Sequence, residues 1–220
     1  MVYGRKPIGT VAYMGGVMSV PEPFCWSFAQ MLQYNSEYVC QSNESIQYSR
    51  SVISFHSAAR NSLVDQIQGD WLLMLDTDIT FEPDLLARML YMFGTVNRLD
   101  VLCGLYQHKG APHPPVLYKW ADDGEHLEAL GAWDKPGERF LIPVASAGAG
   151  CLLVRRTVYE RIRTELKESP FDITFPYGED HSFFLRLKRL GIQAYCDPSI
   201  QVHHLAYRPL SLEDYHPEPA

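Results

Sequence analysis

The sequence has no excess of basic residues and few cysteines. Its 220 residues carry a formal net charge of −7 at pH 7, so the overall balance does not favour binding to a polyanion such as nucleic acid. The five cysteines are an odd number and form no C-x-x-C pair. Most of them lie in apolar stretches, as reduced buried thiols do, which argues against a disulfide framework and indicates a reducing compartment.

Long apolar runs are also missing. The segment MVYGRKPIGT lacks the apolar stretch of a secretory signal, and the most apolar later stretch, 143–154, is short and interrupted by Ser146, Gly148 and Gly150. We therefore expect no membrane segment and a cytoplasmic location. We find no internal repeat or heptad pattern.

The composition is that of a folded chain. Hydrophobic residues make up 46% and charged residues 20%, a balance typical of a soluble globular protein and not of a disordered one. No linker rich in proline, glycine or serine divides the chain. We expect one domain over residues 1–209, followed by a polar tail over 210–220.

The first half alternates short apolar runs with helical patterns. We predict strands at 8–13, 38–41, 71–75 and 101–106, and helices at 21–33, 53–68 and 84–95. This order predicts parallel β-α-β units with helices on both faces of the sheet. In such α/β sheets, ligands bind outside the carboxyl ends of the strands.

The second half has a different pattern, typical of an α+β half that would supply a second wall. It starts with a segment rich in proline and histidine, in which His108, Lys109 and His113 suit either acceptor contacts or a plain surface loop. Further strands are predicted at 140–145, at 151–154, near Ala194 and near Ile200, and helices at 157–168 and 179–190.

Two aspartates follow the most apolar predicted strand without a break. In WLLMLDTDIT, Asp76 and Asp78 would point to the same side if the extended backbone continued past Leu75. Two neighbouring carboxylates repel each other, and a divalent cation such as Mg²⁺ or Mn²⁺ relieves that repulsion. The alternative is an Asx turn that caps the helix starting near Asp84.

Four pieces of sequence occur in a distinctive order. They are SAARNSLVDQIQGDWLLMLDTD at 57–78, GAGCLLVRRTVYERI at 148–162, YGEDHSFFLRLKRLG at 177–191, and the later Val202-His203-His204. Together they resemble the nucleotide-sugar glycosyltransferases with the GT-A fold, in particular the family-two-like group, over most of residues 8–205. The resemblance implies a Rossmann-like, mostly parallel central sheet flanked by helices, with a nucleotide-binding half at about 1–106 and an acceptor-binding half at about 107–209.

The resemblance also assigns donor-binding residues. It implies that Thr10, Ala12, Tyr13 and Met14 line the pocket for the base and ribose, and that Arg60 and Asn61 face the nucleotide. An arginine fork suits a phosphate or a pyrimidine carbonyl. The alternative is an ordinary solvated arginine on a helix.

The metal site follows from the same resemblance. It implies that Asp76 and Asp78 bind the ribose and the Mn²⁺ or Mg²⁺ ion that bridges the donor's diphosphate, with Asp78 the more direct ligand. A histidine near the C-terminal end serves related enzymes as a third ligand, and the spacing favours His204, although His203 stays open. A structural histidine is the alternative.

The remaining pieces imply the catalytic residues. Acidic residues at the corresponding helix start act as the base in inverting members, which gives Asp180 this role with Glu179 beside it. The alternative is that both acids only complement the helix dipole. Gly148 and Gly150 resemble a glycine-containing segment near the donor sugar, or form a simple tight turn.

These inferences predict a metal-dependent glycosyltransferase that moves a sugar from a UDP- or GDP-linked donor to an acceptor hydroxyl. The acceptor class is open among a glycan, a small molecule, a protein and a modified nucleic acid. A nucleotidyltransferase is one alternative, although YMGGVMSVPEP lacks the basic residue of its phosphate loop. A non-catalytic protein that binds nucleotide or carbohydrate is the other.

Overall fold

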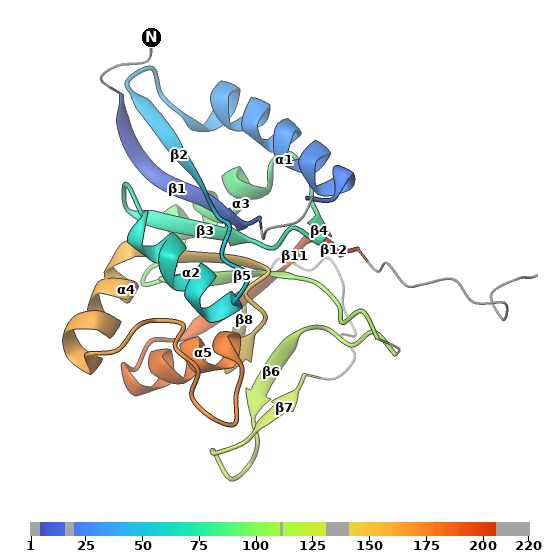
Figure 1. The fold of residues 1–220 in the computed structure, drawn as a ribbon, viewed down its shortest axis with the longest axis vertical. Helices are drawn as coiled ribbons and strands as arrows, with labels where there is room; N and C mark the ends of the chain where they lie inside the picture. The colour runs from blue at the N-terminus through green and yellow to red at the C-terminus, as the bar shows by residue number, and fades with distance from the viewer. Residues whose placement is uncertain (1–4, 16–19, 111, 131–140, 206–220) are drawn as a thin grey trace, which may run out of the picture.

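The computed structural model describes residues 5–15, 20–110, 112–130 and 141–205. The predicted tail at 210–220 and the first residue of the strand predicted at 140–145 lie outside these residues. Figure 1 shows a central sheet that crosses the molecule, with helices on both of its faces.

The central sheet has seven strands in the order β2-β1-β3-β10-β5-β11-β8. They are β1 (Lys6–Met14), β2 (Glu44–Ser51), β3 (Trp71–Leu75), β5 (Val101–Leu105), β8 (Ile142–Val144), β10 (Cys151–Arg155) and β11 (Ala194–Gln201). β1 pairs in parallel with β2 and β3, and β5 with β11, whereas β10 and β8 are antiparallel to their neighbours. The prediction of an α/β fold with a mostly parallel sheet is confirmed.

Two layers of helices cover this sheet. The helices are α1 (Glu22–Tyr34), α2 (His56–Asp65), α3 (Leu85–Thr95), α4 (Arg156–Arg161) and α5 (Glu179–Arg189). The apolar residues of α1 and α3 form one core cluster with the sheet, and those of α2, α4 and α5 form a second on the opposite face. All five side chains of β3 are buried because both of its faces are covered.

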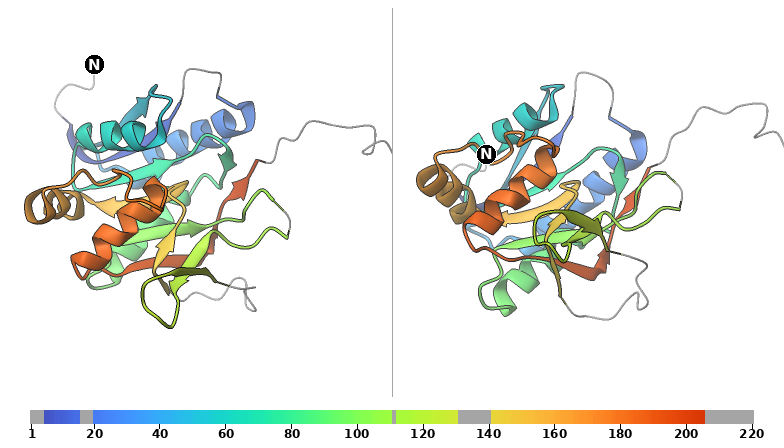
Figure 2. Two further views of the ribbon diagram at one scale, coloured as in Figure 1. Left: turned by 60° about the horizontal axis from the view of Figure 1, so that its bottom comes forward. Right: turned by 90° about the horizontal axis from the view of Figure 1, so that it is seen from below.

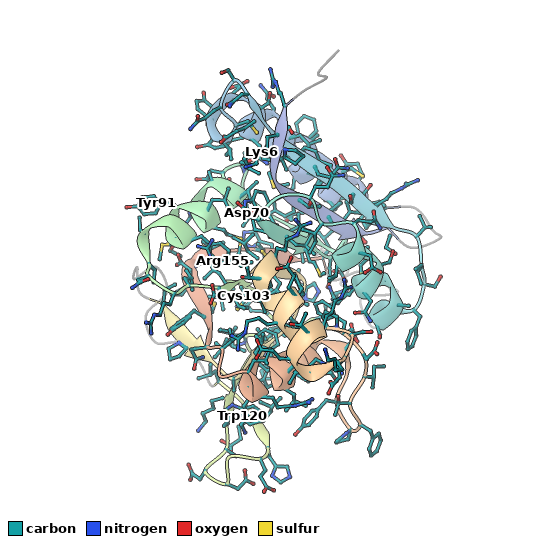
Figure 3. All side chains as sticks on the ribbon, turned by 90° about the vertical axis from the view of Figure 1, so that its left-hand side faces the viewer. Lys6, Asp70, Tyr91, Cys103, Trp120 and Arg155 are labelled. Carbon is teal, nitrogen blue, oxygen red and sulfur yellow. The ribbon has the colours of Figure 1, made fainter. Side chains whose placement is uncertain are left out.

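Two small sheets extend the fold. β6 (Leu117–Trp120) pairs with β7 (Leu127–Ala129) and with β9 (Ser146–Ala147), and the β6–β7 hairpin with Trp120 projects from the body in Figure 3. β4 (Ile79–Thr80) pairs with β12 (His203–His204). Strands from both halves of the sequence therefore meet in shared sheets. No helix within the described residues is long and apolar enough to cross a membrane.

Several predicted elements differ from the structure. The strand predicted at 38–41 is wrong, because the wide helical turn η1 (Asn35–Val39) occupies this region and the strand is instead β2. η1 closes with a hydrogen bond from the Cys40 N–H to the Asn35 carbonyl at 3.1 Å. The helix predicted at 53–68 spans only α2, since Phe55 is extended. The two final strands are one continuous strand, β11.

The helix predicted at 157–168 has a different form. It consists of α4 followed by the wide turn η2 (Ile162–Leu166), after which Lys167 adopts a left-handed conformation with φ 60° and ends it. A left-handed residue is a common way to terminate a helix.

Candidate active site

The carboxyl end of β3 forms the floor of the site. The Asp76 N–H donates a hydrogen bond to the Gly150 carbonyl at 2.9 Å, and the chain then turns at Thr77–Asp78 into β4. The extended backbone expected past Leu75 therefore stops at Asp76, because β4 leaves the central sheet to pair with β12. Asp76 and Asp78 have different partners as a result.

Arg60 connects three acidic residues from distant parts of the chain. It lies on the buried face of α2 and is 2% exposed. Its guanidinium is 3.2 Å from Asp76 Oδ1, 3.5 Å from Glu179 Oε1 and 3.3 Å from Asp180 Oδ1. Its Nη1 also donates to the Ala149 carbonyl at 3.2 Å. The alternative of a solvated helix arginine is therefore wrong.

The electrostatics of this cluster oppose ionisation of its aspartates. Burial raises the pKa of Asp76, Arg60 acts against this shift, and the charges of Asp180 and Asp78 add to it. Burial likewise raises the pKa of Asp180, with Arg60 opposing and Glu179 adding. Burial by itself would lower the pKa of Arg60, but Asp76, Asp180 and Glu179 raise it, so the guanidinium stays charged. A raised carboxyl pKa suits a group that must accept a proton.

Asp180 is held at the first turn of α5. Its Oδ2 accepts a hydrogen bond from the Ala149 N–H at 3.2 Å, while its buried Oδ1 has no hydrogen-bond partner. The following residue, His181, bonds through Nδ1 with the Ser146 hydroxyl at 2.7 Å and lies edge-on to the ring of Tyr118. Asp180 is thus part of a wall built from α5, β6 and β9.

Asp78 belongs to a second group of side chains. Its Oδ2 contacts the Lys109 ammonium and is 3.6 Å from His204 Nε2, and its buried Oδ1 has no hydrogen-bond partner. His204 comes next to Asp78 because β12 pairs with β4, and the register places His204 opposite Ile79. His203, the other histidine left open by the sequence, is exposed.

This second group fits a divalent cation. His204 Nδ1 is 2.8 Å from the Gln107 carbonyl, which can only accept, so Nδ1 carries a proton and Nε2, 3.6 Å from Asp78 Oδ2, is the ring nitrogen on the side of the aspartate. Such a bond orients metal-binding histidines in general. Within the described residues no three side chains of the ligating types form a ready cluster. Asp78 and His204 would therefore supply two ligands, and Asp76 is turned to Arg60 instead.

A cleft of about 180 Å³ lies on the other side of the aspartates. It is lined by Met14, Ile53, Ser54, His56, Asp76, Thr77 and Asp78. His56 Nδ1 is also 3.7 Å from Glu179 Oε1. The sequence reasoning missed the segment from Ile53 to His56, and the signal that could have indicated it is the exposed apolar run before α2.

Of the predicted pocket residues, Met14 lines this cleft, whereas Thr10, Ala12 and Tyr13 do not. Thr10 and Ala12 are 0% exposed. The Thr10 hydroxyl bonds both the carbonyl and the N–H of Gln68, and so joins β1 to the segment before β3. Tyr13 packs against the rings of Phe24 and Phe28. The prediction that Thr10 and Ala12 line the pocket for the base and ribose is wrong, because both side chains are fully buried in the core.

Asn61 also has a structural task. Its side-chain amide donates to Asp172 Oδ1 at 2.9 Å, and its Oδ1 accepts from the Phe171 N–H at 3.0 Å. Both ends of the amide are therefore used to hold the segment that leads to α5. The contact of Asn61 with the nucleotide stays a prediction.

Gly148 and Gly150 lie against the side chain of Tyr106, a residue that the sequence reasoning did not select. The Gly150 N–H donates to the Tyr106 hydroxyl at 3.0 Å. A Cβ at Gly148 would lie 2.0 Å from that hydroxyl, and one at Gly150 would lie 3.0 Å from Asp76 Oδ2. The glycines allow the close approach of Tyr106 and of Asp76, so this segment shapes the site through packing.

Gly148→Ala is expected to lower the free energy of unfolding by about 1–3 kcal/mol, because the new methyl group overpacks against Tyr106. Urea denaturation measures this change. Gly94→Ala is the matched control, since Gly94 lies in α3 with no atom within 4 Å of its added Cβ, and alanine there should be neutral or stabilising. Equal stability of Gly148→Ala and the native protein would show that Tyr106 does not pack as described.

Comparisons with known proteins identify the family of the chain. The chain is 30% identical over 148 residues to the succinoglycan biosynthesis protein ExoM of Rhizobium meliloti (strain 1021), which covers 67% of this chain and 43% of ExoM. The chain therefore spans less than half the length of this relative.

Solved structures show the same fold. GalNAc-T7, crystallised with UDP, GalNAc and Mn²⁺, matches with a TM-score of 0.59 at 13% identity, over 97% of this chain and 45% of GalNAc-T7. A197 from STIV matches with a TM-score of 0.54 at 20% identity, over 89% of this chain and 84% of A197. Since both identities are low, these likenesses concern the fold, and they confirm the GT-A prediction.

The sequence profile described as "Glycosyl transferase family 2" matches residues 32–163. This match includes Arg60, Asp76, Asp78 and the glycines at 148 and 150, and ends before α5. It extends over more than half of the chain. The resemblance drawn from the sequence is confirmed, and the chain belongs to glycosyl transferase family 2.

Proposed function

We propose that this chain is a metal-dependent glycosyltransferase that moves a sugar from a nucleoside diphosphate sugar to an acceptor hydroxyl. The observation that carries the proposal is the convergence of Asp76, Asp78, Glu179 and Asp180 at the carboxyl end of β3, around Arg60 and beside His204. Arg60 lies on α2, Asp76 and Asp78 lie between β3 and β4, Glu179 and Asp180 begin α5, and His204 lies in β12. Four acids in one place suit a site for cations and proton transfer.

The nucleotide would lie over the carboxyl ends of β1 and β3. The cleft beside Met14, Ser54 and His56 is the proposed place of the base and ribose, with Asp76 at its edge. GalNAc-T7, which shares the fold, was solved with UDP, and a UDP- or GDP-linked donor is the corresponding proposal here. Residues 1–106 form the nucleotide-binding half in this proposal, and residues 107–209 the acceptor-binding half.

Asp78 and His204 would hold the metal ion, Mn²⁺ or Mg²⁺. A carboxylate and a neutral imidazole together suit Mn²⁺, and the remaining ligands would come from the donor's diphosphate. When bound, the ion supplies Lewis-acid stabilisation of the charge on the leaving diphosphate. Asp76 takes part through Arg60, which fixes its orientation.

Asp180 is the proposed general base. Its Oδ1 faces Arg60 at 3.3 Å and its Oδ2 is held by the Ala149 N–H, while the side chain stays 28% exposed, so that an acceptor hydroxyl can approach the carboxylate. Glu179 acts as a positioning residue. It lies in the first turn of α5, where its carboxylate contacts Arg60 and His56. The role applies to a transfer that inverts the anomeric carbon, in which the acceptor oxygen attacks as its proton leaves.

The acceptor would bind at the wall formed by α5, β6 and β9. Tyr118 and Tyr177 lie edge-on to His181, next to Asp180. Aromatic faces of this kind offer apolar contact to a sugar ring or another flat group.

The five cysteines are free thiols, which supports the proposed cytoplasmic location.

Asp78→Ala is expected to abolish metal-dependent nucleotide binding, because it removes the carboxylate proposed as direct ligand.

Calorimetric titration with UDP and GDP, each with Mn²⁺ and then with excess chelator, tests the proposed function in the native protein and serves as the measurement for the variant. A nucleotide that binds only with metal supports the proposal and identifies the base. Retained metal-dependent binding by Asp78→Ala would remove this residue from the metal site, and Asp65→Ala, a change in an exposed acid of α2, is the control.

A further inference from the structure

Residues 106–110 and 112–116, between β5 and β6, pair with each other as a hairpin beside the site. The Val116 N–H donates to the Tyr106 carbonyl, and the His108 N–H to the Pro114 carbonyl, each at 2.9 Å. Gln107 forms a β-bridge with Pro115. The hairpin lies next to β12, as the His204 bond to the Gln107 carbonyl requires and Figure 2 shows. Its stem is therefore fixed, and it carries Lys109 near its tip.

Lys109 forms an ion pair with Asp78. Its side chain is 44% exposed and that of Asp78 37% exposed, so the pair lies at the mouth of the site. An exposed ion pair of this kind contributes little, about 0–1 kcal/mol. The contact is easily exchanged for another one, and the long lysine side chain can reach a second partner without movement of the backbone.

The charges of the site leave one cation for a ligand. Asp76, Glu179 and Asp180 share Arg60, which is 2% exposed and enclosed by these acids. In the described part of the chain, Lys109 is the lysine or arginine that contacts Asp78. A diphosphate placed among four carboxylates would be repelled by them, and a metal ion alone leaves part of this negative charge unbalanced.

A pocket beside Lys109 has the chemistry of an anion site. It measures about 220 Å³ and has no acidic residue in its lining, which consists of Gln107, His108, Lys109, His113, Val202, His203 and His204. His113 is held in a left-handed conformation with φ 58°, and its Nδ1 lies 2.9 Å from the His108 carbonyl. Residues other than glycine adopt this conformation infrequently, and here it occurs at a residue that lines the pocket.

We infer that Lys109 is a phosphate-binding residue of the site, which pairs with Asp78 in the free protein and turns to the diphosphate of the donor when Asp78 turns to the metal ion. This inference rests on the proposed function. The exchange involves no covalent step: the ammonium leaves one oxyanion for another, and the carboxylate gains a cation in its place. Lys109 thereby keeps Asp78 paired until the donor and the metal ion arrive.

Lys109→Met tests this exchange through two affinities that should change in opposite directions. Mn²⁺ without nucleotide should bind roughly two- to fivefold more tightly, because a competing cation has been removed from Asp78. UDP, or GDP if the native protein prefers it, should bind about tenfold or more weakly at saturating Mn²⁺, because a charge-assisted bond to phosphate is lost. Both affinities are measured by calorimetry.

Lys119→Met is the matched control, because Lys119 is an exposed lysine of β6 that pairs with Glu128 at 3.2 Å. It makes the same change in charge and should leave both affinities unchanged. Unchanged nucleotide binding by Lys109→Met, or affinities that fall together, would overturn the inference while the proposed function stands. A native protein that binds neither UDP nor GDP with Mn²⁺ would overturn both.

Discussion

Asp180→Asn is expected to lower the rate of sugar transfer by about 10² or more while nucleotide binding stays close to that of the native protein. The amide keeps an oxygen that can accept the hydrogen bond from the Ala149 N–H, so the local structure should be retained. It cannot take a proton from the acceptor hydroxyl, however. Steady-state kinetics with the donor sugar identified by binding, together with calorimetry of the nucleotide, measure the two effects separately.

Glu179→Gln is the comparison that shows which acid is the base. Glu179 contacts Arg60 and His56, so this change should have a much smaller effect on transfer than Asp180→Asn. The reverse order would assign the base to Glu179. Equal loss of nucleotide binding and of transfer in Asp180→Asn would instead indicate a structural role for Asp180 through Arg60.

Arg60→Met is expected to lower the free energy of unfolding by about 3 kcal/mol, the lower end of the range for removing one partner of a buried ion pair. The guanidinium is 2% exposed, and its loss leaves Asp76, Glu179 and Asp180 without their shared cation. The lower end applies because these acids are partly exposed and water can stabilise their charges. Denaturation in urea at pH 7 measures the change.

The loss of stability in Arg60→Met should also depend on pH. Without Arg60, the carboxyl pKa values in the folded state rise further above their unfolded values. The folded state then binds more protons than the unfolded state, so the stability of the variant falls as pH rises from about 4 through the raised values. The deficit relative to the native protein should be smaller at pH 5 than at pH 7.

Arg163→Met provides the control for this prediction. Arg163 pairs with Asp65 at 2.5 Å on the surface, where both side chains are exposed. The change should cost less than about 1 kcal/mol and show little dependence on pH. A loss for Arg60→Met no larger than for Arg163→Met would contradict the description of Arg60 as the buried centre of the site.

Most of the central architecture could be predicted from short-range patterns. The apolar run of β3, the stripe of α3 and the order of strands and helices in the first half require only hydrophobic periodicity. β2 was missed because it lies at the edge of the sheet, and its sequence, ESIQYSRS, has little apolar alternation. Its pairing with β1 stabilises it, and such pairing is invisible to local patterns.

The candidate site was predicted less completely. Arg60, Asp76, Asp78, Glu179, Asp180 and His204 were selected from the sequence, and the structure brings them to one end of the sheet. Their roles in binding and catalysis stay predictions. Thr10 and Asn61 have structural partners that the sequence did not indicate, because a hydroxyl or an amide can serve a ligand or the backbone equally well. Only their partners, Gln68 for Thr10 and the segment at Phe171 for Asn61, decide between these uses.

The sequence by itself determined the α/β class, the glycosyl transferase family and the position of an acidic pair after a buried strand. Only the tertiary structure decided that Asp76 pairs with Arg60 while Asp78 faces Lys109 and His204. The physical reason is the turn at Thr77–Asp78. This turn directs the chain away from the central sheet and into β4, which pairs with β12. Two side chains two positions apart thus have separate partners, and those partners come from segments that are far away in the sequence.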